Sequence, residues 1–188
     1  MIKLYVVRHG NALCNEKKLA ASISEKHCGG LSKLGERQAE DLVSELLKHE
    51  YDAIIVSPMI RAYQTIMPYF KTFTHPPNII ISDLVLERDL GDLKGKILEE
   101  VKKIREGMTD SEKISWIPVN GESLLDVQNR VYKFISYLKD NFEGQSVLLC
   151  SHSVFLRVLN IVLEKKDIGT VFPWEAPDHG LVKSYNIG

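Results

Sequence analysis

The chain has 188 residues, of which 44% are hydrophobic and 26% charged, which is ordinary for a soluble globular protein of about one domain. Lys and Arg total 24 against 25 Asp and Glu, so the formal net charge is −1. Proteins that bind nucleic acids or membrane surfaces usually carry a basic excess, and no apolar run here approaches the length of a membrane span. We therefore expect neither a nucleic-acid partner nor a membrane.

The cysteines and the start of the chain predict a cytoplasmic protein. Cys14, Cys28 and Cys150 are odd in number and widely spaced, and no CxxC pair occurs, so neither a disulfide framework nor a zinc knuckle is supported. We expect all three to be reduced thiols. The first apolar run begins at Ile2 with no basic segment before it, which argues against a secretory leader.

The first part of the chain predicts a strand, a loop, a helix and a second strand. Residues 2–8 are β-branched, aromatic and nearly uncharged, which is typical of a buried strand. A loop of small and polar residues follows. Ser32 is a candidate helix N-cap, and apolar residues at helical spacing predict a helix over 33–48. The apolar run 53–56 predicts the second strand.

The next stretch predicts a helix that begins near Arg61. Pro68 falls inside this helical pattern, and we expect it to kink or end the helix near Met67, because proline has no backbone N–H to donate. Residues 78–82 predict a third strand. The segment 87–96 is charged and contains glycines, which is typical of a loop.

The second half of the chain continues the alternation. Helices are predicted over 96–106 and 123–141, a buried strand over 147–150, a helix over 155–163 and a closing strand over 181–187. Strands that alternate with helices form largely parallel sheets with helices on both faces.

These elements predict an α/β fold of three layers, αβα, with a mostly parallel central sheet flanked by helices. We expect one domain over 1–188. The stretch 94–122 has the least regular pattern, so we predict a small helical insertion there that forms a lid over the site.

Three of the predicted strands end in residues suited to phosphate chemistry. The first ends at Arg8-His9-Gly10, the second is followed by Arg61, and the fourth ends beside His152. Taken singly, such residues are more often solvated or structural. Because the carboxyl ends of parallel strands share one edge of the sheet, however, these groups should converge. Since guanidinium groups hold phosphate oxygens through paired hydrogen bonds, the pattern predicts a positive pocket for a dianionic group.

Over nearly its whole length the chain resembles the histidine phosphatase superfamily, the phosphoglycerate-mutase-like group. Arg8-His9-Gly10 is similar to the family's RHG motif. Further segments match in the family's order: Leu31-Ser32 with Gly35, Gln38 and Ala39; Ser57-Pro58 with Arg61, Ala62 and Thr65; Leu86-Glu87 with Gly91 and Gly95; Gly121-Glu122-Ser123; and Ser151-His152. RHG alone is a weak signal, whereas five ordered matches are a strong one.

The resemblance implies a mechanism of phosphoryl transfer. His9 would be the nucleophile that forms a phosphohistidine, and Glu87 would be the general acid and then the base for water. The groups that would hold the phosphoryl oxygens are Arg8, Asn15, Arg61 and His152. No metal or cofactor is expected, because the cations of the pocket would themselves neutralise the phosphate.

Some positions depart from the family pattern. Asn11 and Ala12 stand where members commonly have an acidic residue and a hydroxyl residue, so substrate contacts from those positions are not carried over. His179 stands where many members have a small residue or asparagine. Contact with substrate is one interpretation of His179, and a histidine in a surface turn is the one we expect.

The predicted function is hydrolysis of a small phosphomonoester, as in the phosphatase branch of the family. A phosphoglycerate mutase is the first alternative, although true mutases are generally longer between the core motifs. The second alternative is a non-catalytic phosphate-binding module, which would bind without turnover. The expected partner is a phosphorylated small-molecule substrate, and the resemblance leaves a homodimer open.

Overall fold

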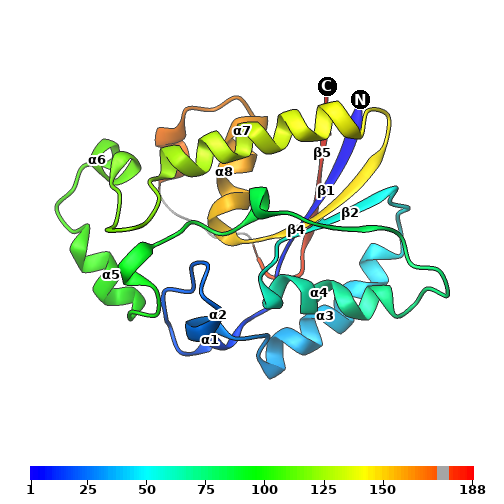
Figure 1. The fold of residues 1–188 in the computed structure, drawn as a ribbon, viewed down its shortest axis with the longest axis horizontal. Helices are drawn as coiled ribbons and strands as arrows, with labels where there is room; N and C mark the ends of the chain where they lie inside the picture. Colours follow the sequence, from blue (N-terminus) through cyan, green and yellow to red (C-terminus); the bar gives the residue numbers. More distant parts are fainter. Residues whose placement is uncertain (173–177) are drawn as a thin grey trace.

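A five-stranded sheet runs through the centre of the molecule (Figure 1). The computed structural model describes residues 1–172 and 178–188. The strands are β1 (Ile2–Arg8), β2 (Ala53–Val56), β3 (Ile79–Ile81), β4 (Ser146–Ser151) and β5 (Val182–Ile187). Their order is β3-β2-β4-β1-β5; the first four are parallel, and β5 is antiparallel to β1. The predicted α/β class with a mostly parallel sheet is confirmed.

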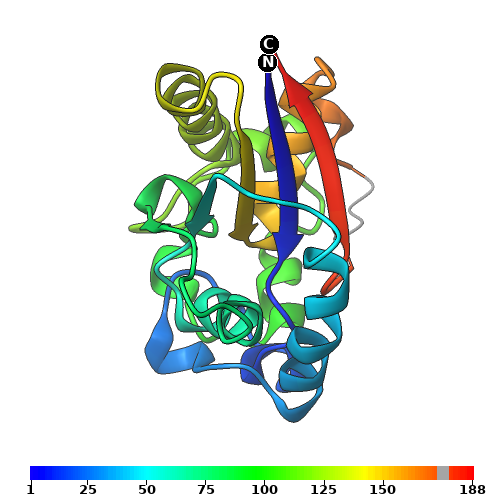
Figure 2. The same ribbon diagram turned by 90° about the vertical axis from the view of Figure 1, so that its right-hand side faces the viewer.

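Helices cover both faces of the sheet. On one face, α3 (Lys33–Leu46) and α4 (Ile60–Phe70) pack in a core that includes Tyr5 and Val7 of β1. On the other face, α7 (Leu124–Asn141) and α8 (Ser153–Leu163) pack in a core that includes Leu4 and Val6. Alternate residues of one strand therefore supply two apolar layers, as the period of a strand requires. Figure 2 shows both termini side by side, at the opposite end of the sheet from the carboxyl end of β1.

Helix α4 passes through Pro68 and ends at Phe70, so of the kink or end predicted near Met67 the end is not observed. Pro68 lacks the N–H of one helical hydrogen bond, yet the turn that follows is held by packing. Tyr69 and Phe70, the last two residues of α4, are buried in the core between the sheet and the helices α3 and α4. Their burial offsets the missing bond, since tertiary packing supplies most of the stability of a helix.

The segment 94–122 contains two short helices at one side of the molecule, α5 (Leu98–Ile104) and α6 (Asp110–Ser115) (Figure 1). The first is shorter than the predicted helix over 96–106, and the second was not predicted. A capping box begins α6: Glu112 N–H donates to Thr109 Oγ1 at 3.2 Å, and Thr109 N–H donates to the Glu112 carboxylate at 2.7 Å. None of the helices in the described ranges is long and apolar enough to cross a membrane.

Short elements complete the chain. The predicted loop after β1 contains α1 (Leu13–Glu16) and α2 (Glu25–Cys28). Single 3₁₀ turns follow β3, the Glu87 segment and α8: η1 (Asp83–Val85), η2 (Gly91–Leu93) and η3 (Ile168–Val171).

Two of the three cysteines form a disulfide. Cys14 and Cys28 are bonded, with Cα atoms 4.4 Å apart, whereas Cys150 is free and buried. The prediction of three reduced thiols is therefore wrong for this pair. The loop folds back on itself, with Leu13 N–H donating to the Gly30 carbonyl at 3.1 Å, and this return brings the two cysteines together. A separation of 14 residues carries no local signal for such a pairing.

Candidate active site

The carboxyl ends of β1, β2 and β4 bring three of the predicted residues into contact. His9 follows β1, Arg61 lies in the first turn of α4 after β2, and His152 is the N-cap residue of α8 after β4. The centroids of the two imidazole rings are 5.0 Å apart. The parallel register produces this convergence, because Arg8 lies level with Ser151 across the β1–β4 ladder.

Arg61 links the two imidazoles. Its Nε donates to His9 Nε2 at 3.2 Å, and its Nη2 donates to His152 Nδ1 at 3.0 Å and to the carbonyl of Ser22 at 2.8 Å. The side chain is 0% exposed. Its Nη1 has no hydrogen-bond partner in the part of the chain that the structure describes. A buried donor without a partner is a candidate for a hydrogen bond to an oxygen of a bound oxyanion.

The His9 imidazole is held as a neutral ring. Its Nδ1 lies 2.7 Å from the Gly10 carbonyl, which can only accept, so Nδ1 carries the proton. Burial, and then the positive charge of Arg61, lower the pKa of His9 well below its usual value. The lone pair therefore lies on Nε2, the atom that faces Arg61. This is the form of an imidazole that can attack phosphorus.

His152 is neutral for the same physical reasons but has the other tautomer. Burial, followed by Arg61, lowers the pKa of His152 well below its usual value. Because Arg61 donates to Nδ1, the proton of His152 lies on Nε2, which donates to Ser57 Oγ at 2.7 Å. Ser57 follows β2, so this bond ties the ends of two neighbouring strands together.

Gly10 lets a helix come close to the backbone of the RHG motif. A Cβ atom at Gly10 would lie 2.8 Å from the carbonyl oxygen of Gly35 in α3, and one at Gly35 would lie 1.9 Å from the carbonyl of Asn11. The two glycines thus allow a close approach between α3 and the segment that follows β1. His9 N–H donates to the Ser151 carbonyl at 3.0 Å, which fixes the same segment to β4.

Glu87 lies at the N-terminal end of α8 and is 9% exposed. Its Oε1 accepts from the backbone N–H of Arg88 at 2.9 Å and of Val154 at 3.1 Å. The N-terminus of a helix favours a carboxylate at this place. Burial lowers the pKa of both Arg8 and Arg61, and the negative charge of Glu87 is the largest opposing effect in each case. The carboxylate and the two guanidinium groups therefore belong to one electrostatic cluster.

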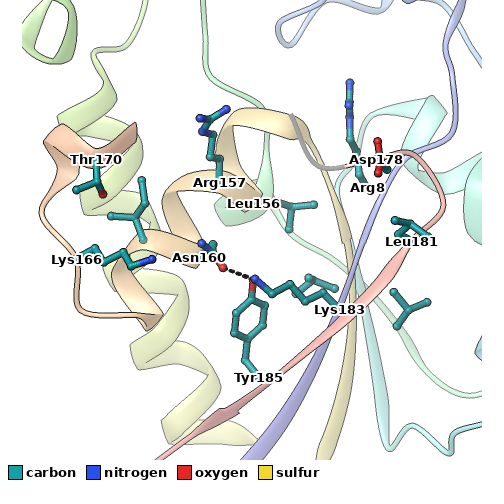
Figure 3. A pocket seen from close by; sticks show the side chains of 13 residues that line it. Arg8, Leu156, Arg157, Asn160, Lys166, Thr170, Asp178, Leu181, Lys183 and Tyr185 are labelled. Atoms are coloured by element: carbon teal, nitrogen blue, oxygen red, sulfur yellow. Dashed lines mark hydrogen bonds between the residues drawn. The ribbon is translucent and has the colours of Figure 1, made fainter. Parts of the chain in front are cut away.

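The remaining predicted residues, Arg8 and Asn15, are placed differently. Asn15 Oδ1 accepts from the Ala12 N–H at 2.9 Å, so this oxygen caps α1. Arg8 is half-buried and lies beside Asp178 at one end of a cavity of about 640 Å³ between α8 and β5 (Figure 3). Of the six predicted site residues, Arg8 alone lines this cavity. In the described part of the chain, no group of three or more His, Cys, Asp or Glu residues is placed to hold a metal ion.

His179 is not the surface residue that we predicted. It is half-buried, its Nδ1 donates to the His9 carbonyl at 2.5 Å, and its ring centroid lies 5.6 Å from that of His9. The contact depends on the antiparallel pairing of β5 with β1, which places the turn before β5 next to the end of β1. The local sequence of the turn contains no signal for this.

The sequence and the geometry together identify the class of protein. The family model of the histidine phosphatase superfamily (branch 1) matches residues 4–184, so the chain belongs to that superfamily. It is an enzyme of the phosphatase or mutase-like kind.

Three relatives illustrate the range of the match. The chain is 29% identical over 173 residues to phosphoserine phosphatase 1 of Hydrogenobacter thermophilus, with 89% of this chain and 79% of the relative covered. It is 30% identical over 173 residues to the 2,3-bisphosphoglycerate-dependent phosphoglycerate mutase of Cytophaga hutchinsonii, with 86% and 77% covered. The alpha-ribazole phosphatase of Shigella flexneri shares the fold, with a TM-score of 0.83, 22% identity, and 99% and 91% of the two chains covered.

Proposed function

We propose that the protein is a metal-independent phosphatase that hydrolyses a small phosphomonoester through a phosphohistidine on His9. The observation that carries this proposal is the environment of His9 Nε2. The ring is neutral and buried, its lone pair is on Nε2, and Arg61 Nε donates to that nitrogen at 3.2 Å. A nucleophile and a cationic clamp are thus in contact before substrate binds.

In the first step, His9 Nε2 attacks phosphorus. The new P–N bond forms as the P–O bond to the leaving group breaks. When the ester binds, the Arg61 Nε–H donates to a phosphoryl oxygen in place of His9 Nε2, which frees the lone pair for the attack, and Nη1 supplies a second donor. Arg8, Asn15 and His152 complete the proposed phosphate site. Such prearranged donors are the main source of rate enhancement in phosphoryl transfer.

Glu87 serves the leaving group and then water. As general acid it gives its proton to the ester oxygen that departs; as the resulting carboxylate it takes a proton from the water that hydrolyses the P–N bond. Glu87 is buried in the same electrostatic cluster as Arg8 and Arg61, which supports its place in the site. After both steps the enzyme is restored, and inorganic phosphate and an alcohol are released.

The segment 94–122 is proposed to be the lid of this site. Arg88, the neighbour of Glu87, donates from Nη2 to the Trp116 carbonyl at 2.9 Å and from Nε to the Glu122 carbonyl at 2.7 Å. Two guanidinium groups also lie near the Trp116 ring, that of Arg88 at 5.5 Å and that of Arg105 at 5.7 Å from its centroid. The lid is therefore attached to the loop that carries the proposed acid.

A phosphoglycerate mutase remains the second candidate, since curated mutases at 30% identity are among the relatives. The two functions share phosphorylation of His9 and differ in the acceptor, which is water in one and a phosphoglycerate hydroxyl in the other. A mutase assay primed with bisphosphoglycerate separates them. The names of the relatives make phosphoserine, 3-phosphoglycerate and alpha-ribazole phosphate the first esters to screen for hydrolysis.

The proposal is tested with p-nitrophenyl phosphate in the presence of EDTA. We expect turnover by the wild type and by the exposed-histidine control His75→Ala, and loss of turnover in His9→Ala. Rapid quenching with a ³²P-labelled ester should trap an acid-labile, alkali-stable label on the wild type. Metal-dependent turnover, or equal rates for the wild type and His9→Ala, would overturn the mechanism.

A further inference from the structure

The turn before β5 contacts the backbone that carries His9. His179 Nδ1 donates to the His9 carbonyl at 2.5 Å, across a separation of 170 residues, and Gly180 N–H donates to the Arg8 carbonyl at 3.4 Å. Asp178, the preceding residue, lies beside Arg8 (Figure 3). Three consecutive residues thus face the RHG motif from the far end of the chain.

A side chain supplies this contact because the ladder between the two strands has ended. The pairing of β1 with β5 stops at Val7 and Val182, whereas β1 stays paired with β4 as far as Arg8. Past that point the described part of β5 gives His9 no backbone donor. The imidazole of His179 takes the place of one.

The His9 carbonyl and the Gly10 N–H belong to the same planar peptide unit. One end of this unit is held by His179, and at the other end Gly10 N–H donates to Thr65 Oγ1 at 2.9 Å. Holding both ends fixes the rotation of the plane. The same plane contains the Cα atom of His9, so its rotation sets the direction in which the His9 side chain leaves the backbone. The Gly10 carbonyl, which accepts the proton of His9 Nδ1 at 2.7 Å, belongs to the next peptide unit, and the N–H of that unit, on Asn11, donates to Gln38 Oε1 at 2.7 Å.

From this chain of contacts we propose that His179 is a positioning residue for the nucleophile, whose hydrogen bond to the His9 carbonyl aims Nε2 at phosphorus. The inference rests on the proposed function. Losing this bond should slow the attack more than it weakens phosphate binding, because the guanidinium clamp is held by other contacts. Misplacement of a reacting atom lowers the rate steeply.

Two amide substitutions separate positioning from a general structural role. The amide nitrogen of His179→Asn is attached to Cγ, as Nδ1 is, so it can donate to the same carbonyl. The amide of His179→Gln lies one bond further out, near the place of Nε2, and cannot. His179→Ala removes the donor altogether, and His75→Ala is the exposed-histidine control.

The measurements are the rapid-quench rate of ³²P labelling of His9, the KM for p-nitrophenyl phosphate, and the melting temperature. We expect His179→Ala and His179→Gln to label about five- to tenfold more slowly, the usual effect of one lost hydrogen bond, with KM within about twofold of wild type. His179→Asn should recover most of the rate.

Several results would refute this role. If the Ala and Gln variants label as fast as the wild type, His179 does not position His9, while the phosphohistidine mechanism stands. If His179→Asn is as slow as His179→Gln, and all three His179 variants melt at equally lowered temperatures, the contact is structural only. If the wild type itself is never labelled, the proposed function and this inference both fail.

Discussion

Replacing Arg61 by methionine should separate the activity of this protein from its stability. The guanidinium is fully buried, and three hydrogen bonds join it to His9, His152 and the Ser22 carbonyl. No carboxylate is among these partners. Methionine keeps most of the apolar volume and removes the charge.

The magnitude follows from two opposing effects on folding. Hydrogen bonds from a charged donor contribute about 1.5–3 kcal/mol each, so losing three is costly. Burying a guanidinium away from water costs several kcal/mol, and that cost also disappears. We therefore expect the free energy of unfolding of Arg61→Met to lie within about 2 kcal/mol of the wild type. For catalysis no such cancellation exists, and losing the clamp should lower kcat by about 10²–10³.

The assay pairs urea unfolding with hydrolysis of p-nitrophenyl phosphate, and the exposed Arg37→Met is the control for both. The pKa of His9 and that of His152 should rise in Arg61→Met, because the positive charge of Arg61 lowers both in the wild type. NMR titration measures this rise. Retained kcat would refute the assignment of Arg61 as the clamp. Destabilisation by much more than about 3 kcal/mol would show that the buried cation mainly holds the fold together.

Three further predictions concern the acid, the histidines and the disulfide. Glu87→Gln should slow alkyl esters by about 10²–10⁴ and p-nitrophenyl phosphate much less, because nitrophenolate leaves without a proton; equal losses would contradict its role as the acid. The folded-state pKa of His9 and of His152 lies below the unfolded value of about 6.5, so stability is complete above that pH and falls on acidification, by up to about 2.7 kcal/mol per pH unit for two protons. Urea unfolding that gives the same stability at pH 7.5 and 5.5 would contradict this. Reducing the Cys14–Cys28 disulfide with a dithiol should cost about 3 kcal/mol, and the Cys14→Ser/Cys28→Ser double variant should match the reduced wild type; an unchanged melting temperature would contradict it.

Local sequence patterns were sufficient for the main layers of the fold. Apolar runs located the strands, and helical spacing located α3, α7 and α8 to within a few residues. These patterns succeed because burial on one face of a helix, or within a covered sheet, leaves its period in the chain. The same patterns failed at Pro68, where packing of Tyr69 and Phe70 extends a helix that local rules would end.

By itself the sequence determined that Arg8 ends a strand and that His9, Arg61 and His152 follow strand ends, and the parallel topology that it implies brings such ends to one edge. Only the tertiary structure decided the Cys14–Cys28 pairing and the contact of His179 with His9. It also decided the neutral state of both site imidazoles, because that depends on burial and on where Arg61 lies. The physical reason is distance along the chain: periodicity records what each segment buries, whereas pairings across 14 or 170 residues depend on the path between them.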